Sequence, residues 1–234
     1  STYLHIPLVL MLLGIIARGT AFTFRHYDAV KDNWQVLYTQ IFYYASLLTP
    51  FFLGLIAAAT VSHSINPDAV GFLDLYVFSW LNWFGVSVGL FTVALCAYLA
   101  SIFSLRETRD KADLLLMIRK SKQTMIFVVV TGILVFATAY ISDIPLLMWV
   151  FSKPLGIMAI AFATIALLLI LRAMNRQKLL PVRALAGFQM VMILVAATYQ
   201  HNPDIILLGN GQHLSLLEHM APEKTIAALG WALM

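Results

Sequence analysis

Charged side chains are scarce in this sequence. Asp, Glu, Lys and Arg make up 11% of the 234 residues, whereas hydrophobic residues make up 61%. Because an ordinary soluble domain carries roughly a quarter charged residues, this composition excludes water as the main solvent of the chain. The formal net charge of +4 therefore predicts no nucleic-acid partner, and the informative feature is where the basic residues lie along the chain.

Residues that carry chemistry are also scarce. The one cysteine, Cys96, lies in an apolar segment, so it forms no intrachain disulfide and gives no redox or metal pattern. Glycine-rich phosphate loops and Ser-His-Asp arrangements are absent, which disfavours a free-standing enzyme, and no residue is predicted to be catalytic or to bind a metal. None of the histidines forms a spaced pair suited to haem or metal ligation: His5, His26, His63, His201, His213 and His219.

Long apolar runs dominate the chain instead. A helix needs about 20 mainly apolar residues to cross the hydrocarbon core of a bilayer, and the sequence contains six such runs and the start of another. The predicted fold class is therefore all-α, a polytopic transmembrane helical bundle that forms a single domain over residues 1–234. The expected spans lie near residues 3–24, 36–61, 76–105, 124–142, 155–171 and 184–200, with a seventh beginning over 226–234.

Basic residues alternate between the loops. Twelve of the fifteen Lys and Arg residues follow the first, third and fifth spans, while the intervening loops hold only Lys153 and Lys224. Because Lys and Arg concentrate in cytoplasmic loops, the basic loops are predicted to be cytoplasmic and residue 1 to lie outside. The regular alternation also supports the number of spans.

Two segments between the spans and the two ends of the chain carry further expectations. Residues 106–123 are expected to form a solvated connector, with a short amphipathic surface helix as the less favoured alternative. Residues 201–225, rich in turn-forming residues, are expected to form an exterior loop. Both ends of the chain are apolar, so the sequence is expected to be a piece of a longer protein.

The first span contains Arg18, the one charged residue well inside a predicted span. A charge at that depth costs a few kcal/mol on insertion scales, which leaves two interpretations open: a buried partner, or snorkelling to the nearby interface. Arg25 follows seven residues later on the same helical face. Two guanidinium groups on one face at a membrane boundary suit carboxylates, propionates or lipid phosphates.

The string from Arg18 to Arg25, Arg-Gly-Thr-Ala-Phe-Thr-Phe-Arg, resembles the Arg-Gly-x-Ala-Phe-x-Phe-Arg signature of subunit II of cytochrome bd-type quinol oxidases. Thr23 stands where that family commonly has an acidic residue, which argues against a proton route through a carboxylate here. Further stretches resemble the family in the same order along the chain: Trp34, then Pro50 with Gly54, then Leu81-Asn82-Trp83-Phe84-Gly85 with Gly89, then residues 97–100, then 199–203 with 214–216.

The resemblance implies a second, non-haem-ligating subunit of a quinol:oxygen oxidoreductase in the respiratory chain of a bacterial inner membrane. Such a subunit is not catalytic alone and supports haem assembly in subunit I, which carries haem b and haem d. A path for dioxygen or protons and a structural quinone site are further expectations. The implied partners are subunit I, small accessory subunits, quinol, dioxygen and membrane lipid. The candidate structural or cofactor-proximal residues are Arg18, Arg25, Trp34 and Asn82.

Two alternatives belong to other classes of protein. A membrane transporter would carry its substrate between the helices, and such proteins often show broken helices, internal repeats and charged residues at the midplane. The sequence shows no convincing internal repeat, and Arg18 is its one charge well inside a predicted span. A membrane scaffold without a redox partner is the other alternative.

Overall fold

Six long helices form the body of the protein. The computed structural model describes residues 3–27, 34–65, 71–105, 107, 110–177, 179–201, 204–207, 213–215 and 222–233. Within these ranges, six helices are long and apolar enough to cross a membrane, which confirms the predicted all-α polytopic bundle with six spans. They are α1 (His5–Tyr27), α2 (Trp34–Val61), α4 (Trp83–Ser104), α5 (Lys111–Ile141), α7 (Pro154–Asn175) and α8 (Leu179–Thr198).

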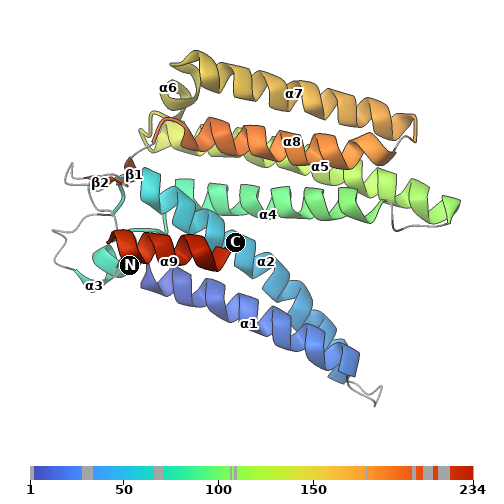
Figure 1. The fold of residues 1–234 in the computed structure, drawn as a ribbon, viewed down its shortest axis with the longest axis horizontal. Coiled ribbons are helices and arrows are strands. Elements are labelled where there is room, and N and C mark those ends of the chain that lie inside the picture. The colour runs from blue at the N-terminus through green and yellow to red at the C-terminus, as the bar shows by residue number, and fades with distance from the viewer. Residues whose placement is uncertain are drawn as a thin grey trace.

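Shorter elements gather at one end of the bundle (Figure 1). Helices α3 (Phe72–Tyr76) and α6 (Leu146–Phe151) lie there, as does an antiparallel pair of strands, β1 (Asp204–Leu207) and β2 (His213–Ser215). The strands occupy part of the segment that was expected to be an irregular loop. Helix α9 (Glu223–Leu233) has 11 residues and covers most of the stretch where a seventh span was expected to begin.

The long helices alternate in direction, so the helix ends that flank the basic segments lie at the same end of the bundle (Figure 1). We call this the basic end: α1, α4 and α7 finish there, and α2, α5 and α8 begin there. Helix α2 packs on α1 and α4, α4 also packs on α5, and α7 packs on α8. Near the basic end, α4, α5, α7 and α8 share a hydrophobic core. Five residues of this core are each at most 1% exposed: Ile102, Leu105, Ile170, Met174 and Val182.

The helix of the third expected span, 76–105, begins later in the structure than expected. Helix α3 ends at Tyr76 and α4 begins only at Trp83. Asn82 caps the start of α4, because its side-chain oxygen accepts a hydrogen bond of 2.6 Å from the Gly85 backbone N–H. A side-chain cap of this kind satisfies one of the backbone donors left open in the first turn of a helix, so the sequence itself sets the start of α4.

The prediction of a solvated connector over 106–123 is wrong for its larger part. Helix α5 begins at Lys111 and continues without interruption into the apolar span that was expected from residue 124. The Asp110 side chain caps it by accepting from the Ala112 N–H at 3.3 Å, and Asp113 lies in the first turn, where a negative charge stabilises the helix dipole. No proline or glycine interrupts residues 111–131, so nothing stops the helix.

Close helix crossings depend on small residues. A β-carbon on Gly54 of α2 would lie 2.8 Å from the α-carbon of Gly89 on α4. Gly14 of α1 faces the Thr49 side chain of α2 at a similarly short distance, 2.5 Å from a β-carbon to the hydroxyl oxygen. Glycine lets backbones approach closely in membrane helices. These contacts fix α1, α2 and α4 as one group, and the first cavity lies on that group.

Candidate functional site

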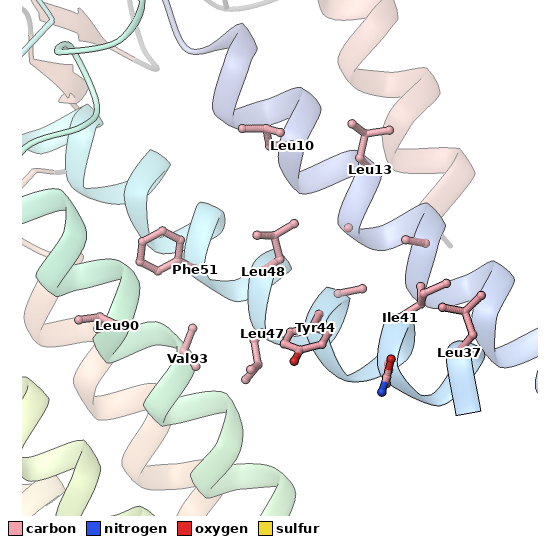
Figure 2. A pocket seen from close by; sticks show the side chains of 14 residues that line it. Leu10, Leu13, Leu37, Ile41, Tyr44, Leu47, Leu48, Phe51, Leu90 and Val93 are labelled. Carbon is pink, nitrogen blue, oxygen red and sulfur yellow. The ribbon is translucent and has the colours of Figure 1, made fainter. Parts of the chain in front are cut away.

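A lateral groove runs along the side of the bundle over α1, α2 and α4 (Figure 2). Its volume is about 750 Å³, and its lining is almost wholly apolar. Figure 2 shows α2 in the middle, with Leu10 and Leu13 reaching in from α1 and Leu90 and Val93 from α4. This volume has room for small apolar molecules.

The lateral groove does not fit a haem. Among the residues lining it, none is a His, Met or Cys, and these are the usual ligands of haem iron. Its polar side chains are those of Gln40 and Tyr44 on α2, and no charged residue belongs to its lining. The arrangement therefore suits an uncharged, largely apolar occupant.

Arg18 lies next to the groove, and its guanidinium group lies over an aromatic ring. It follows Ala17, which lines the groove, and its guanidinium carbon lies 5.4 Å from the centre of the Phe42 ring on α2. The Arg18 side chain is exposed, and no carboxylate of the described residues lies within ion-pair distance of it. A cation over an aromatic face contributes about 0.5–1 kcal/mol at an exposed site, so among the described residues the charge has only this weak partner.

Arg25 lies in the last turn of α1, and Trp34 is the first residue of α2. Both side chains are exposed, Trp34 by 58%, and the backbone carbonyl of Arg25 accepts a 3.5 Å hydrogen bond from the Gln35 side chain. Thr23, in the acidic position of the signature, donates its hydroxyl to the Gly19 carbonyl at 3.0 Å. The structure thus places the two candidates at the basic end without joining them to Arg18 in one site.

Asn82, the fourth candidate, lies away from the arginines at the opposite end of the bundle. Its recorded interaction is the cap of α4, and Gly85 completes that turn, because a β-carbon there would lie 2.7 Å from the Trp80 carbonyl oxygen. The Leu-Asn-x-Phe-Gly stretch is thereby accounted for by local helix geometry. The four candidates do not converge on a shared site.

Sequence reasoning missed the polar contacts inside the bundle. The Tyr98 hydroxyl on α4 donates to the Gln189 side chain on α8 at 2.7 Å, with both residues at most 4% exposed. Ser87 on α4 also pairs with Thr138 on α5 at 2.7 Å. Because these pairs are neutral, a search for charged residues within the spans does not find them. A search for Tyr, Gln, Ser and Thr within apolar spans would have found them.

Arg183 makes the one ion pair among the described residues. Its guanidinium donates to the Phe103 backbone carbonyl and, at 3.2 Å, to the Glu107 carboxylate. It also lies 5.3 Å from the centre of the Phe103 ring. The side chain therefore ties the start of α8 to the end of α4 at the basic end.

A second cavity, the end pocket, lies at the opposite end of the bundle from the basic loops. Its volume is about 520 Å³, and α2, α4, α5, α6 and α8 contribute to its lining. Trp149, Tyr199 and His201 belong to that lining, and the Trp149 and His201 rings meet edge to face at 4.6 Å. The Tyr199 hydroxyl donates to the Trp149 carbonyl at 2.7 Å, which fixes the end of α8 against α6.

His201 is half-buried in this pocket. Burial lowers the pKa of His201 below its ordinary value, and the positive charge that His63 can carry lowers it further. The imidazole is therefore mainly neutral at neutral pH. In the described part of the chain, no group of three or more His, Cys, Asp or Glu residues is placed to hold a metal ion.

Comparison with known proteins gives two matches. The model of the family described as cytochrome bd terminal oxidase subunit II matches residues 1–234. The cytochrome bd ubiquinol oxidase subunit 2 of Bacillus subtilis (strain 168) is 30% identical over 142 residues, which are 59% of this chain and 40% of the relative. The match thus spans less than half of the relative's length. Neither match supports the transporter alternative.

Proposed function

Because the chain belongs to the family of cytochrome bd terminal oxidase subunit II, whose model covers all of its residues, we propose that it is the second subunit of a bd-type quinol:oxygen oxidoreductase. In this role it works beside a haem-bearing subunit I, supports the assembly of haem b and haem d there, and ligates no haem itself. Quinol, dioxygen and membrane lipid are the further partners, and small accessory subunits complete the complex.

The whole-chain family match carries this proposal, and the fold supports it. Six apolar helices make the chain a multi-pass membrane protein. The lining of the lateral groove holds no His, Met or Cys, the commonest ligands of haem iron, so catalytic haem chemistry is better placed in the neighbour. The exposed candidates Arg18, Arg25 and Trp34 lie where a neighbouring subunit or a cofactor edge can reach them.

The lateral groove suits the two apolar occupants that the family resemblance implies. Dioxygen is small and apolar, so a groove of about 750 Å³ without a charged lining residue is an adequate route along the helices. A quinone bound there would place its isoprenoid tail among the leucines of α1 and α2. Gln40 and Tyr44 are the side chains able to hydrogen-bond its ring oxygens.

We place the basic end on the cytoplasmic side of a bacterial inner membrane. The described Lys and Arg side chains of α1, α5, α7 and α8 gather there, and cytoplasmic loops are the ones enriched in these residues. This orientation puts the end pocket near the outer surface and residue 1 outside.

Oxygen uptake by membranes tests the proposed activity. Membranes from cells that lack this chain are compared with membranes from the same cells after its re-expression, with a reduced quinol as electron donor. We expect quinol-driven oxygen consumption to fall in the deletion and to return with the chain. Equal consumption in both preparations, when subunit I is present in each, would contradict the proposed function.

A further inference from the structure

The first turns of α5 extend past the neighbouring helices at the basic end (Figure 1). The Thr124 hydroxyl of α5 pairs at 3.0 Å with that of Ser101, which lies near the end of α4. The Lys122 ammonium donates at 2.7 Å to the side chain of Asn175, the last residue of α7. Because α5 begins at Lys111, roughly ten of its residues, or about 15 Å at 1.5 Å per residue, lie beyond the ends of α4 and α7.

One side of this projecting part of α5 packs on the bundle and the other is exposed. Ile118 belongs to the hydrophobic core near the basic end, and Leu114 and Met117 pack against that core. Leu115 and Leu116 lie on the other side and are each 58% exposed. The packed side therefore holds the helix in place, while the outer side presents two large apolar side chains.

Two cations lie one helical turn away on the same outer side. The spacing of four residues places Arg119 beside Leu115 and Lys120 beside Leu116, and both basic side chains are exposed. Among the described residues neither of them forms an ion pair. Asp113 borders this surface, which still keeps an excess of positive charge. We call these four residues the tip face: Leu115, Leu116, Arg119 and Lys120.

The leucines of the tip face lie too far from the apolar span to be covered by lipid. No charged residue lies between positions 124 and 142, so the hydrocarbon core begins near Thr124. Leu115 and Leu116 precede that point by about 12–14 Å along the helix, whereas the polar layer on each side of a bilayer is about 5–8 Å thick. Arg119 and Lys120 lie at the outer edge of this layer, and the leucines lie beyond it.

The order of side chains thus favours a protein over a membrane surface. At a lipid interface the apolar groups would lie deeper than the cations, and here they lie further out. Apolar side chains in water gain free energy when another apolar surface covers them, and an amphipathic helix is a common form of such a cover. The unpaired cations beside the leucines add a preference for acidic residues in that helix.

We propose that the tip face binds an acidic amphipathic helix of a partner protein. Apolar side chains of that helix cover Leu115 and Leu116, and its Asp or Glu residues pair with Arg119 and Lys120. In the orientation proposed above, the partner approaches from the cytoplasm. The inference does not depend on the oxidase activity, because it uses only the exposed side of α5.

A synthetic peptide tests the charge requirement. The full chain, with the subunits that accompany it, is reconstituted in nanodiscs of phosphatidylcholine, and empty nanodiscs give the baseline. A fluorescein-labelled helical peptide with a leucine face flanked by glutamates is titrated by fluorescence anisotropy. We expect the same peptide with glutamine in place of glutamate to bind several-fold more weakly, because exposed ion pairs contribute modestly. Equal binding of the two peptides would overturn the proposal.

Substitutions at exposed positions locate the peptide. The double change Leu115→Ser and Leu116→Ser is expected to weaken binding by about tenfold or more. Leu180→Ser is the matched control, because Leu180 is 72% exposed near the start of α8 at the same end, and it should leave binding unchanged. The double change Arg119→Gln and Lys120→Gln should weaken binding several-fold. Unchanged binding in both double variants would contradict the proposed site.

Cysteine labelling tests whether the tip face is free in the assembled complex. In a Cys96→Ala background, Leu115→Cys should react with a membrane-impermeant maleimide much faster than Ile133→Cys, which is exposed in the middle of the apolar part of α5. The acidic peptide should slow the reaction at position 115. If both thiols react equally slowly, lipid or an accompanying subunit already covers the tip face, and the proposal is wrong.

Discussion

The polar side chains between the helices are mostly neutral and hydrogen-bonded in pairs. Tyr98 with Gln189 joins α4 to α8, and Ser87 with Thr138 joins α4 to α5. Measured hydrogen bonds between membrane helices contribute about 0.6 kcal/mol each on average. These pairs therefore set the mutual register of the helices and supply only a small part of the free energy of folding.

Arg18 is the residue whose proposed role depends most on a partner. Its charge lies over Phe42 and meets no carboxylate in the described part of the chain. We expect Arg18→Gln to lower the yield of haem-containing complex, because an acidic group of the neighbouring subunit or a cofactor would lose its counter-charge. Phe42→Leu, which removes only the contact with the ring, is the control and should assemble normally.

Haem content per mole of purified chain and quinol oxidase turnover measure this effect. If Arg18→Gln retains normal haem content, assembly and turnover, Arg18 has no such partner. Snorkelling to the membrane interface would then account for it.

His201 makes the end pocket sensitive to acid. Its pKa in the folded protein is lowered, first by burial and then by His63, whereas the unfolded chain binds a proton near the ordinary pKa of about 6.5. Folding is therefore favoured above about pH 6.5, and that advantage is lost as the pH falls below this value toward the folded-state pKa.

Thermal unfolding of the wild type and of His201→Gln, at pH 7.5 and at pH 5.5, measures this dependence. We expect a smaller loss of Tm on acidification in the variant, which has no proton to take up at this position. An equal loss in both proteins would show that His201 does not contribute to the pH dependence.

At the scale of single residues, the sequence predicted few of the contacts of the candidate site. Asn82 was singled out from a resemblance, yet its recorded contact is a helix cap whose acceptor and donor are three residues apart. Tyr199, Trp149 and His201 form one cluster only because α6 folds against the end of α8. Contacts between residues so distant in sequence depend on helix packing, which periodicity and composition do not specify.

Helices α2 and α4 approach each other closely at a pair of glycines. A β-carbon on Gly54 would meet the α-carbon of Gly89 and the carbonyl oxygen of Val88, each at 2.8 Å. Both obstacles are backbone atoms, so neither yields by a change of rotamer. We expect Gly54→Ala to destabilise the protein by about 1–3 kcal/mol through overpacking.

Gly187→Ala in α8 is the matched control, because nothing lies within 4 Å of its added β-carbon. Alanine there should leave stability unchanged or raise it by up to about 1 kcal/mol, since alanine favours helix over glycine. Thermal unfolding in detergent compares the two variants. Equal stability of both would contradict the close crossing of α2 and α4.

Apolar length predicted which helices exist, while capping residues determined where they begin. The six spans follow from runs of apolar residues long enough to cross a bilayer. The start of α5 at Lys111 follows from the Asp110 cap and from the absence of a helix breaker, although the charges of that segment favoured a connector. A helix that extends beyond the hydrocarbon core can carry charged residues. The charges of this segment therefore did not indicate where α5 begins.

The whole molecule is electrically asymmetric along the bundle. The loops and helix ends at the basic end carry twelve basic and five acidic residues, and those at the other end carry two basic and six acidic residues. Such an asymmetry predicts a single orientation in the membrane, with the basic end in the cytoplasm.

Cysteine labelling in intact cells tests this orientation. In a Cys96→Ala background, Lys153→Cys and Arg176→Cys place one exposed thiol at each end of the bundle. A membrane-impermeant maleimide should label Lys153→Cys in intact cells and Arg176→Cys only after permeabilisation. The reverse labelling would place the basic end outside.

The central claim is that this bundle is the haem-free partner of a haem-bearing subunit. The most direct measurement is purification through an affinity tag on this chain in mild detergent, followed by identification of the accompanying chains and by the reduced-minus-oxidised haem spectrum. The account predicts that a second membrane subunit copurifies, that the haem spectrum is present, and that the haem remains with that subunit when the two are separated. A pure, assembled chain without haem or partner, or haem that stays with this chain after separation, would contradict it.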